Sequence, residues 1–273
     1  MAGRRRRPVA LHSVFERTVH EQGRSLSSWT LSLLALSLGL TALFPTIRAN
    51  PQLARLHETY PKALRSLFDL SDLTTAVGYV RAEVFSLTVP MLVVIFAVLW
   101  GSDLVAGEED RGTIDLLLAN PVTRRRVLLE KWAALAAGVG LASVGIGAGL
   151  GVGLAAFGMR IGAGEVAAAV VATGLLGLLF GSVALALGAA TGRRGLARGI
   201  TALLAVAAYL ASTLANLVSW LGPVRAASPW YHTLGVDPLV SGFELWHLLL
   251  VVAMTVAVVA AGSAAFDRRD LAV

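Results

Sequence analysis

The sequence predicts an all-α polytopic membrane protein with six transmembrane helices, folded as a single transmembrane domain over residues 1–273. Of the 273 residues, 56% are hydrophobic and only 15% are charged, whereas a soluble domain of this length has about 25% charged residues. Apolar runs of roughly 20 residues recur along the chain, and this is the length that a helix needs to cross a bilayer.

The spans are expected where these apolar runs fall, and they are separated by polar connections rich in Pro, Gly or charge. The connection 46–80 is long and polar, and 221–243 is rich in Pro, Trp and Gly. Trp and Tyr residues near the span ends are typical of interfacial anchors. Those at the inner boundary are Trp29, Trp100 and Trp132, and those at the outer boundary are Trp220, Trp230, Tyr231 and Trp246. The six spans are predicted at about 26–45, 82–100, 129–157, 165–190, 200–220 and 244–265.

The distribution of basic residues predicts the orientation of these spans. If the N-terminus is inside, 16 of the 23 Lys and Arg residues lie on the inner side and 7 on the outer side. Such an excess marks the cytoplasmic face. We therefore expect a multi-pass protein of the cell membrane with both termini in the cytoplasm. The same rule accounts for the net charge of +6, so we do not expect a nucleic acid as a partner.

Residues 10–25 precede the first span and have an amphipathic pattern. Leu11, Val14, Phe15 and Val19 fall on one face of a helix. This pattern predicts an N-terminal interfacial helix that lies in the headgroup region. The Arg4–Arg7 block ahead of it is typical of a retained cytoplasmic tail and not of a cleaved signal peptide.

Glycines recur every four residues in the third and fourth spans. Small residues at this spacing allow two helix backbones to approach closely, so close helix packing is the favoured interpretation. A moving or ligand-lining surface is the alternative. The predicted packing positions are Gly145, Gly149 and Gly153 in span three and Gly177 and Gly181 in span four.

The polar segment 101–131, between spans two and three, carries much of the charge in one place. Leu104–Ala119 is predicted to form a short amphipathic helix, bent or divided at Gly107 and Gly112. Asn120-Pro121 ends that helix, and Thr123 is expected to cap the helix that follows. The acids of the segment are Asp103, Glu108, Glu109, Asp110 and Asp115, and its basic block is Arg124, Arg125, Arg126 and Lys131.

Several kinds of chemistry are not supported by the sequence. It has no phosphate loop of the GxxxxGK[ST] type, no HExxH pair and no GxSxG elbow, and it has no cysteine. We therefore predict neither an enzyme nor a metal site. No predicted span has a charged residue near its middle, which argues against a transporter driven by an ion gradient.

The polar segment resembles the cytoplasmic motif of permease subunits of type-2 ABC transporters, largely exporters. That motif has an acidic residue, a Gly-Thr pair, an apolar group, Pro-[VI]-[ST]-Arg and a downstream Lys. The corresponding residues are Glu108 to Thr113, Leu116 to Leu118, Pro121-Val122-Thr123-Arg124 and Lys131. Length, six spans, an amphipathic N-terminal segment and the Phe266-x-Arg268-Arg269-Asp270 ending extend the resemblance over the whole chain.

The resemblance implies that the segment is a coupling helix that docks on a separate nucleotide-binding ATPase subunit. ATP and Mg would be bound by that partner and no cofactor by this chain. A second permease copy, identical or different, would complete the translocation path. The residues implied to contact the ATPase are Glu108, Glu109, Asp110, Arg111, Gly112, Thr113, Asp115, Pro121, Thr123 and Arg124; for the arginines, setting the topology is the main expected role.

The absence of charge within the spans predicts a hydrophobic or amphipathic substrate, such as a drug, an antibiotic or a lipid-like molecule. Two alternatives remain open at this stage. One is a helical membrane scaffold or assembly factor that transports nothing, and the other is an ion-coupled secondary transporter.

Overall fold

The computed structural model describes residues 13–50, 73–112, 123–215 and 222–269. Six helices in these ranges are long and apolar enough to cross a membrane, and the described residues contain no strand. The fold class and the number of spans predicted from the sequence are confirmed. The helical segments are α1 (Val14–Ala42), α2 (Phe44–Ala49), α5 (Ala76–Val80), η2 (Arg81–Phe85), α6 (Thr88–Ser102), η3 (Asp103–Gly107), α7 (Glu108–Asp110), α9 (Arg124–Ala156), α10 (Ala163–Thr191), α11 (Arg194–Leu214), α12 (Gly222–Ala227), η5 (Tyr231–Gly235), α13 (Pro238–Ser241) and α14 (Leu245–Arg268).

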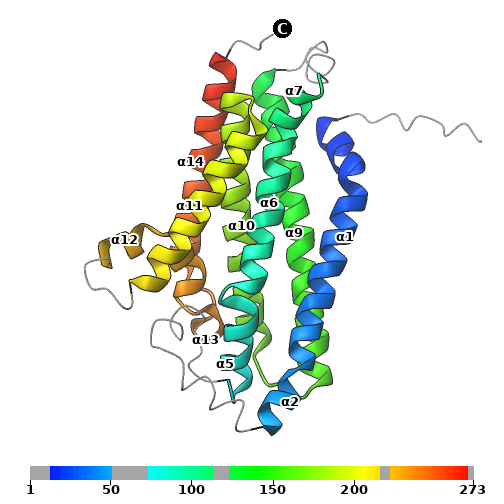
Figure 1. Ribbon diagram of the computed structural model, residues 1–273, viewed down its shortest axis with the longest axis vertical. Coiled ribbons are helices and arrows are strands. Elements are labelled where there is room, and N and C mark those ends of the chain that lie inside the picture. Colours follow the sequence, from blue (N-terminus) through cyan, green and yellow to red (C-terminus); the bar gives the residue numbers. More distant parts are fainter. Residues whose placement is uncertain (1–12, 51–72, 113–122, 216–221, 270–273) are drawn as a thin grey trace, which may run out of the picture.

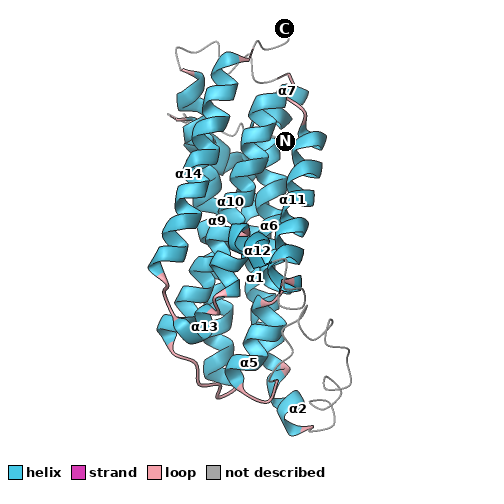
Figure 2. Cartoon of the chain, turned by 90° about the vertical axis from the view of Figure 1, so that its left-hand side faces the viewer, coloured by secondary structure: helices cyan, strands magenta, loops and turns pink. Residues whose placement is uncertain are grey.

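The long helices form a bundle around α10, which packs against α6, α9, α11 and α14, while α1 packs mainly on α9. In Figure 1 and Figure 2, α7 and the C-terminus lie at one end of the bundle, and α2, α5 and α13 lie at the other. We call the first of these the charged end. It also holds the starts of α1, α9 and α11.

The first span differs from its prediction. Residues 14–25 are not a separate interfacial helix, because α1 runs without a break from Val14 to Ala42. Ser13 caps it, accepting a hydrogen bond from the Glu16 N–H. No proline lies between these residues to end the helix before the span, and Gly23 lies within α1 without interrupting it.

The second span is longer than predicted and includes the first part of the polar segment. The helix continues from α6 through the π-helical turn η3 and α7 to Asp110. Gly112 then adopts φ +65°, a left-handed conformation that ends helices and favours glycine. The predicted helix over Leu104–Ala119 is therefore, up to Asp110, an extension of span two, and its remainder lies outside the described residues.

The predicted glycines lie at the closest contacts between helices. A Cβ atom on Gly145 would lie 2.7 Å from the Thr30 carbonyl oxygen, and one on Gly149 would lie 2.3 Å from that of Leu34. Larger residues would separate α9 from α1 at these points. Of the other three, Gly153 faces Thr41 of α1, Gly177 faces Val93 of α6, and Gly181 faces Ala97 of α6 and Leu135 of α9.

Two of the predicted tryptophan anchors are instead part of the core. Trp100 is 6% exposed and Trp230 is 3% exposed. Trp100 fills the space that Gly138 leaves on α9, and Trp230 packs edge-on against Tyr209. A ring near a span end anchors in the lipid interface only if its helix turns it outward, and only the packing of the helices fixes that rotation.

Candidate functional site at the charged end of the bundle

The residues from Asp103 to Gly112 at the end of span two form what we call the acidic segment. Two glycines fix its conformation. Gly107 leaves room for the Asp103 carboxylate, since a Cβ at this position would lie 2.3 Å from Asp103 Oδ1. At the end of the segment, the Gly112 N–H donates to the Glu109 carbonyl, 2.9 Å away. Together they present three consecutive acids, Glu108 to Asp110, on the last turn of a long helix.

Glu108 is bound to Lys131 of α9 in a nearly buried ion pair. Lys131 Nζ lies 2.6 Å from Glu108 Oε1 and also donates to the Leu104 carbonyl at 2.5 Å. The two side chains are 1% and 12% exposed for Lys131 and Glu108. An ammonium removed from water needs such partners. The pair therefore fixes the acidic segment to the start of span three.

Glu109 is bound to Arg269, which follows the last helix. The guanidinium group meets both carboxylate oxygens, at 2.5 Å and 3.0 Å, and also donates to the Ala189 carbonyl at 3.3 Å. Arg124 holds the same stretch by donating to the carbonyl groups of Phe266, at 3.2 Å, and of Arg269. A two-pronged Arg–carboxylate contact also fixes orientation, so the end of α14 is tied to the acidic segment.

Gly192, in the turn between α10 and α11, makes room for this contact. It has φ +66°, and a Cβ there would lie 2.1 Å from Arg269 Nη2 and 2.7 Å from Glu109 Oε2. The turn therefore passes directly beside the Glu109–Arg269 pair.

Asp103 is the centre of a second cluster, which reaches α11. Its carboxylate lies 3.2 Å from Arg111, 2.9 Å from Arg194 and 3.9 Å from Arg198. Arg194 also lies 3.5 Å from Asp110. Asp103 is 19% exposed and the arginines are 36–51% exposed, so this cluster borders on solvent and its individual pairs contribute little on their own.

Glu130 of α9 joins that helix to the start of α1. Glu130 accepts a hydrogen bond from the Phe15 N–H at 3.2 Å and pairs with Arg126 at 2.8 Å. Its carboxylate thus satisfies an N–H group of the first turn of α1, where negative charge is favourable.

The predicted site residues fall into three groups. Glu108, Glu109, Asp110 and Arg111 lie together at the charged end, with the turn at Gly112 beside them. Thr123 caps α9, accepting a hydrogen bond from the Arg126 N–H, as predicted, and Arg124 is directed toward the end of α14. Thr113, Asp115 and Pro121 lie outside the described residues.

Sequence reasoning missed the partners of the two glutamates. Lys131 was recognised only as part of a motif, and Arg269 only as part of the chain ending. Arg194 entered only as one of the 16 Lys and Arg residues on the inner side. The one sequence signal that these three residues share is that each is basic and lies in a segment that the topology places at the same end as the acids. Glu109 and Arg269 are 160 positions apart, and no local spacing connects them.

A smaller polar cluster lies at the opposite end of the bundle. Arg81 of η2 pairs with Asp237, which adopts φ +55° at the start of α13. His232 Nδ1 lies 2.7 Å from His247 Nδ1, and His247 Nε2 lies 3.3 Å from Glu244. Within the described ranges, no group of three or more His, Cys, Asp or Glu side chains could hold a metal ion.

The fold and the charged end together define a class of protein. Six apolar helices, with α10 at their centre and ion pairs joining them at one end, form a helical multi-pass membrane protein. Residues 24–271 match the model of the family described as ABC-2 family transporter protein, and the chain belongs to that family. It is thus a permease subunit of an ABC transporter. A comparison with curated proteins gives no significant match.

Proposed function

We propose that the chain is the permease of an ATP-driven exporter for a hydrophobic or amphipathic substrate. A separate ATPase subunit, which binds ATP and Mg, drives it through the acidic segment, and a second permease copy completes the translocation path. The observation that supports this proposal best is the double attachment of that segment, through Glu108 to Lys131 and through Glu109 to Arg269.

These attachments suggest how a displacement of the acidic segment is transmitted to the other helices. The segment is continuous with span two, so a displacement there acts on α6 directly. The Lys131 pair passes it to α9, the Arg269 pair to the end of α14, and the Asp103–Arg194 contact to the start of α11. Four spans would therefore move together, which is what alternating access to a path requires.

The orientation that we propose places the charged end and both termini in the cytoplasm, with the chain in the cell membrane. The excess of Lys and Arg at this end supports it. An ATPase subunit in the cytoplasm would then meet Glu108 to Gly112 from the accessible side, where Asp110 is 46% exposed.

The substrate class rests on the chemistry of the spans. From Ala133 to Ala156, span three has no Asp, Glu, Lys or Arg, and the same is true from Val84 to Ser102 in span two. Without charge at depth the chain offers no counter-ion to a charged substrate. The substrate that fits this chemistry is a largely apolar molecule, which needs only packing and hydroxyl contacts.

The test is reconstitution of the purified chain with its ATPase subunit in vesicles. We expect ATPase activity to rise when the two are combined, and Glu109→Lys or Gly112→Pro to abolish the rise while the chain stays folded. Arg24→Gln is the matched control. It removes an exposed charge near the same end, and we expect wild-type stimulation.

Each rival function gives a different result in this assay. A scaffold would not stimulate any ATPase, and failure of the chain to co-purify with one would refute the proposal. A secondary transporter would move substrate in response to an ion gradient without ATP, which would refute it as well.

A further inference from the structure

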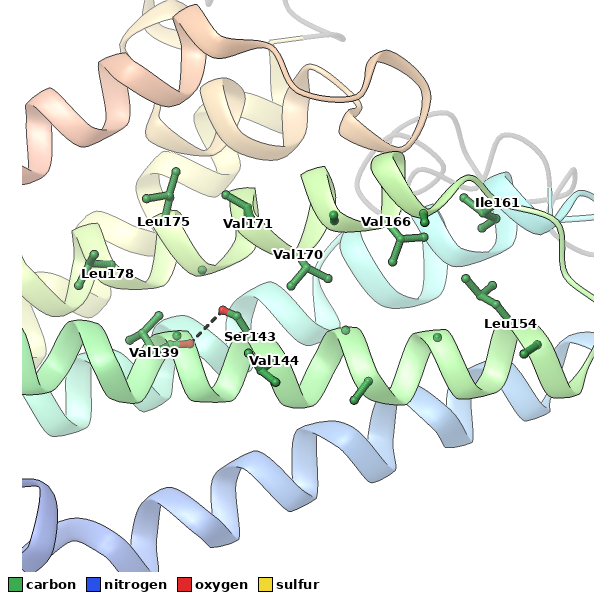
Figure 3. Close-up of a pocket in the computed structure, with 18 of the residues that line it drawn as sticks. Val139, Ser143, Val144, Leu154, Ile161, Val166, Val170, Val171, Leu175 and Leu178 are labelled. Atoms are coloured by element: carbon green, nitrogen blue, oxygen red, sulfur yellow. Dashed lines mark hydrogen bonds between the residues drawn. The ribbon is translucent and has the colours of Figure 1, made fainter.

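A groove of about 920 Å³ lies between α9 and α10 (Figure 3). Its size is at the upper end of ordinary ligand pockets, which have about 300–1,000 Å³. Val139 and Val170 are buried at its floor, at 2% and 9% exposure, whereas Val144 and Val171 are 66% and 41% exposed. The groove is therefore a recess between two spans and is open to the surroundings of the bundle.

The recess is not needed for packing within the chain. A Cβ atom on Gly140 or Gly151, which both line it, would meet nothing within 4 Å. Gly145 and Gly149, on another face of the same helix, have no such space and pack against α1. Each open glycine costs the helix about 1 kcal/mol relative to alanine, and among the described residues no neighbour occupies the space beside either of them.

The lining offers almost no polar contact. Ser143 is the one lining side chain, among the described residues, that carries a hydroxyl or other polar group, and it donates to the Val139 carbonyl of its own helix at 2.9 Å. Figure 3 shows this hydrogen bond as a dashed line beside aliphatic side chains. A ligand with polar groups would lose hydrogen bonds in this groove, whereas a hydrocarbon chain would lose none.

The loop at one end of the groove carries a basic residue. Met159 and Ile161 both line it, and the residue between them is Arg160. Arg160 is exposed, and the part of the chain that the structure describes offers it no hydrogen bond or ion pair. The nearby Glu165 is folded onto the loop, since a Cβ on Gly162 would lie 1.9 Å from its Oε2. A free guanidinium at this position is well suited to a phosphate group.

We propose that this groove binds a phospholipid, with an acyl chain along α9 and α10 and its phosphate on Arg160. From Ala163 to Leu178 the α10 wall is about 22 Å long at 1.5 Å per residue. That exceeds half of the roughly 30 Å hydrocarbon core, so one acyl chain of a single leaflet fits along it. The site does not depend on the transported substrate and stands whether or not the chain exports.

The experiment counts phospholipid that stays bound to the full chain after purification in mild detergent, by native mass spectrometry and by phosphorus assay. Gly140→Leu/Gly151→Leu puts two large side chains into the groove, at positions where an added Cβ has nothing within 4 Å. Arg160→Gln removes the phosphate contact. Gly39→Leu is the control, since Gly39 of α1 also has nothing within 4 Å but lies outside the groove.

We expect bound phospholipid to fall about tenfold in the filled variant, which corresponds to about 1.4 kcal/mol of binding. Arg160→Gln should reduce it less, by about threefold, and Gly39→Leu should retain the wild-type amount. Equal phospholipid in the filled variant and the control would overturn the proposal.

Two other occupants would also be visible in the same spectra. Gly147 and Gly151, four residues apart, could pack against a helix of a second copy. If the filled variant loses a second copy and keeps its phospholipid, the groove is an interface between permeases and the proposal is wrong. Loss of a bound compound without phosphorus would overturn it in favour of a substrate site.

Discussion

Lys131 and Glu108 form a salt bridge of 2.6 Å at the junction of spans two and three, and the Lys131 side chain is 1% exposed. Two charges so far from water are stable only as a pair, because each alone would have to be desolvated without compensation. The pair therefore makes the acidic segment and the start of α9 a single unit.

Replacing Lys131 with Met should destabilise the protein strongly. The substitution leaves the Glu108 carboxylate without its ammonium, at a cost of about 3–5 kcal/mol. Thermal unfolding of the purified protein in detergent measures the loss. Glu108→Leu/Lys131→Met should recover most of it, because no charge remains unpaired. Arg126→Met, which breaks an exposed pair with Glu130, should cost about 0–1 kcal/mol. Equal costs for Lys131→Met and Arg126→Met would contradict this account.

The Glu109–Arg269 contact predicts a charge-exchange result. Arg269→Glu places two carboxylates together, so the end of α14 should detach and become accessible to protease, with a loss of about 1.5–3 kcal/mol. Glu109→Arg/Arg269→Glu restores opposite charges and should recover much of the stability. A double-mutant cycle on unfolding midpoints gives the coupling between the two positions. If the effects of the two single substitutions on stability add in the double variant, the contact does not contribute to stability.

Gly192 and Gly158 form a matched pair of positions. Both have positive φ, of +66° and +63°, but only Gly192 has the Arg269 and Glu109 side chains within reach of a Cβ. Gly158→Ala should therefore cost only the left-handed backbone strain, about 1–2 kcal/mol. Gly192→Ala should cost more and should also weaken stimulation of the ATPase subunit. The comparison fails if the two variants have the same unfolding midpoint and the same stimulation.

The two glycine faces of α9 predict opposite responses to alanine. Gly149→Ala puts a methyl group 2.3 Å from the Leu34 carbonyl oxygen, and forcing α1 and α9 apart should cost about 1–3 kcal/mol. Gly151→Ala meets open space and should be neutral or stabilising, because alanine favours a helix by about 1 kcal/mol over glycine. Unfolding midpoints in the same detergent decide the matter; a more stable Gly149→Ala protein would refute the contact.

Part of the fold could be predicted because it depends only on the properties of residues that are neighbours in the sequence. The length of the apolar runs predicted the six spans. The threonine that follows Asn120-Pro121 predicted the cap of α9 at Thr123. Where a prediction depended on how a helix is rotated or continued, it failed. Trp100 was predicted at the lipid interface and lies in the core. Residues 10–25 were predicted to form a separate helix, but from Val14 onward they are part of α1.

The sequence by itself determined the class of the protein, the number of its spans and the segment in which much of its charge is concentrated. Hydrophobicity and charge act residue by residue, so they can be read in order along the chain. Only the tertiary structure decided that Glu108 meets Lys131, that Glu109 meets Arg269, and that Gly140 and Gly151 face a groove while Gly145 and Gly149 face α1. These relations depend on which faces of distant helices pack together, and the free energy of that packing is shared among contacts that no single stretch of sequence contains.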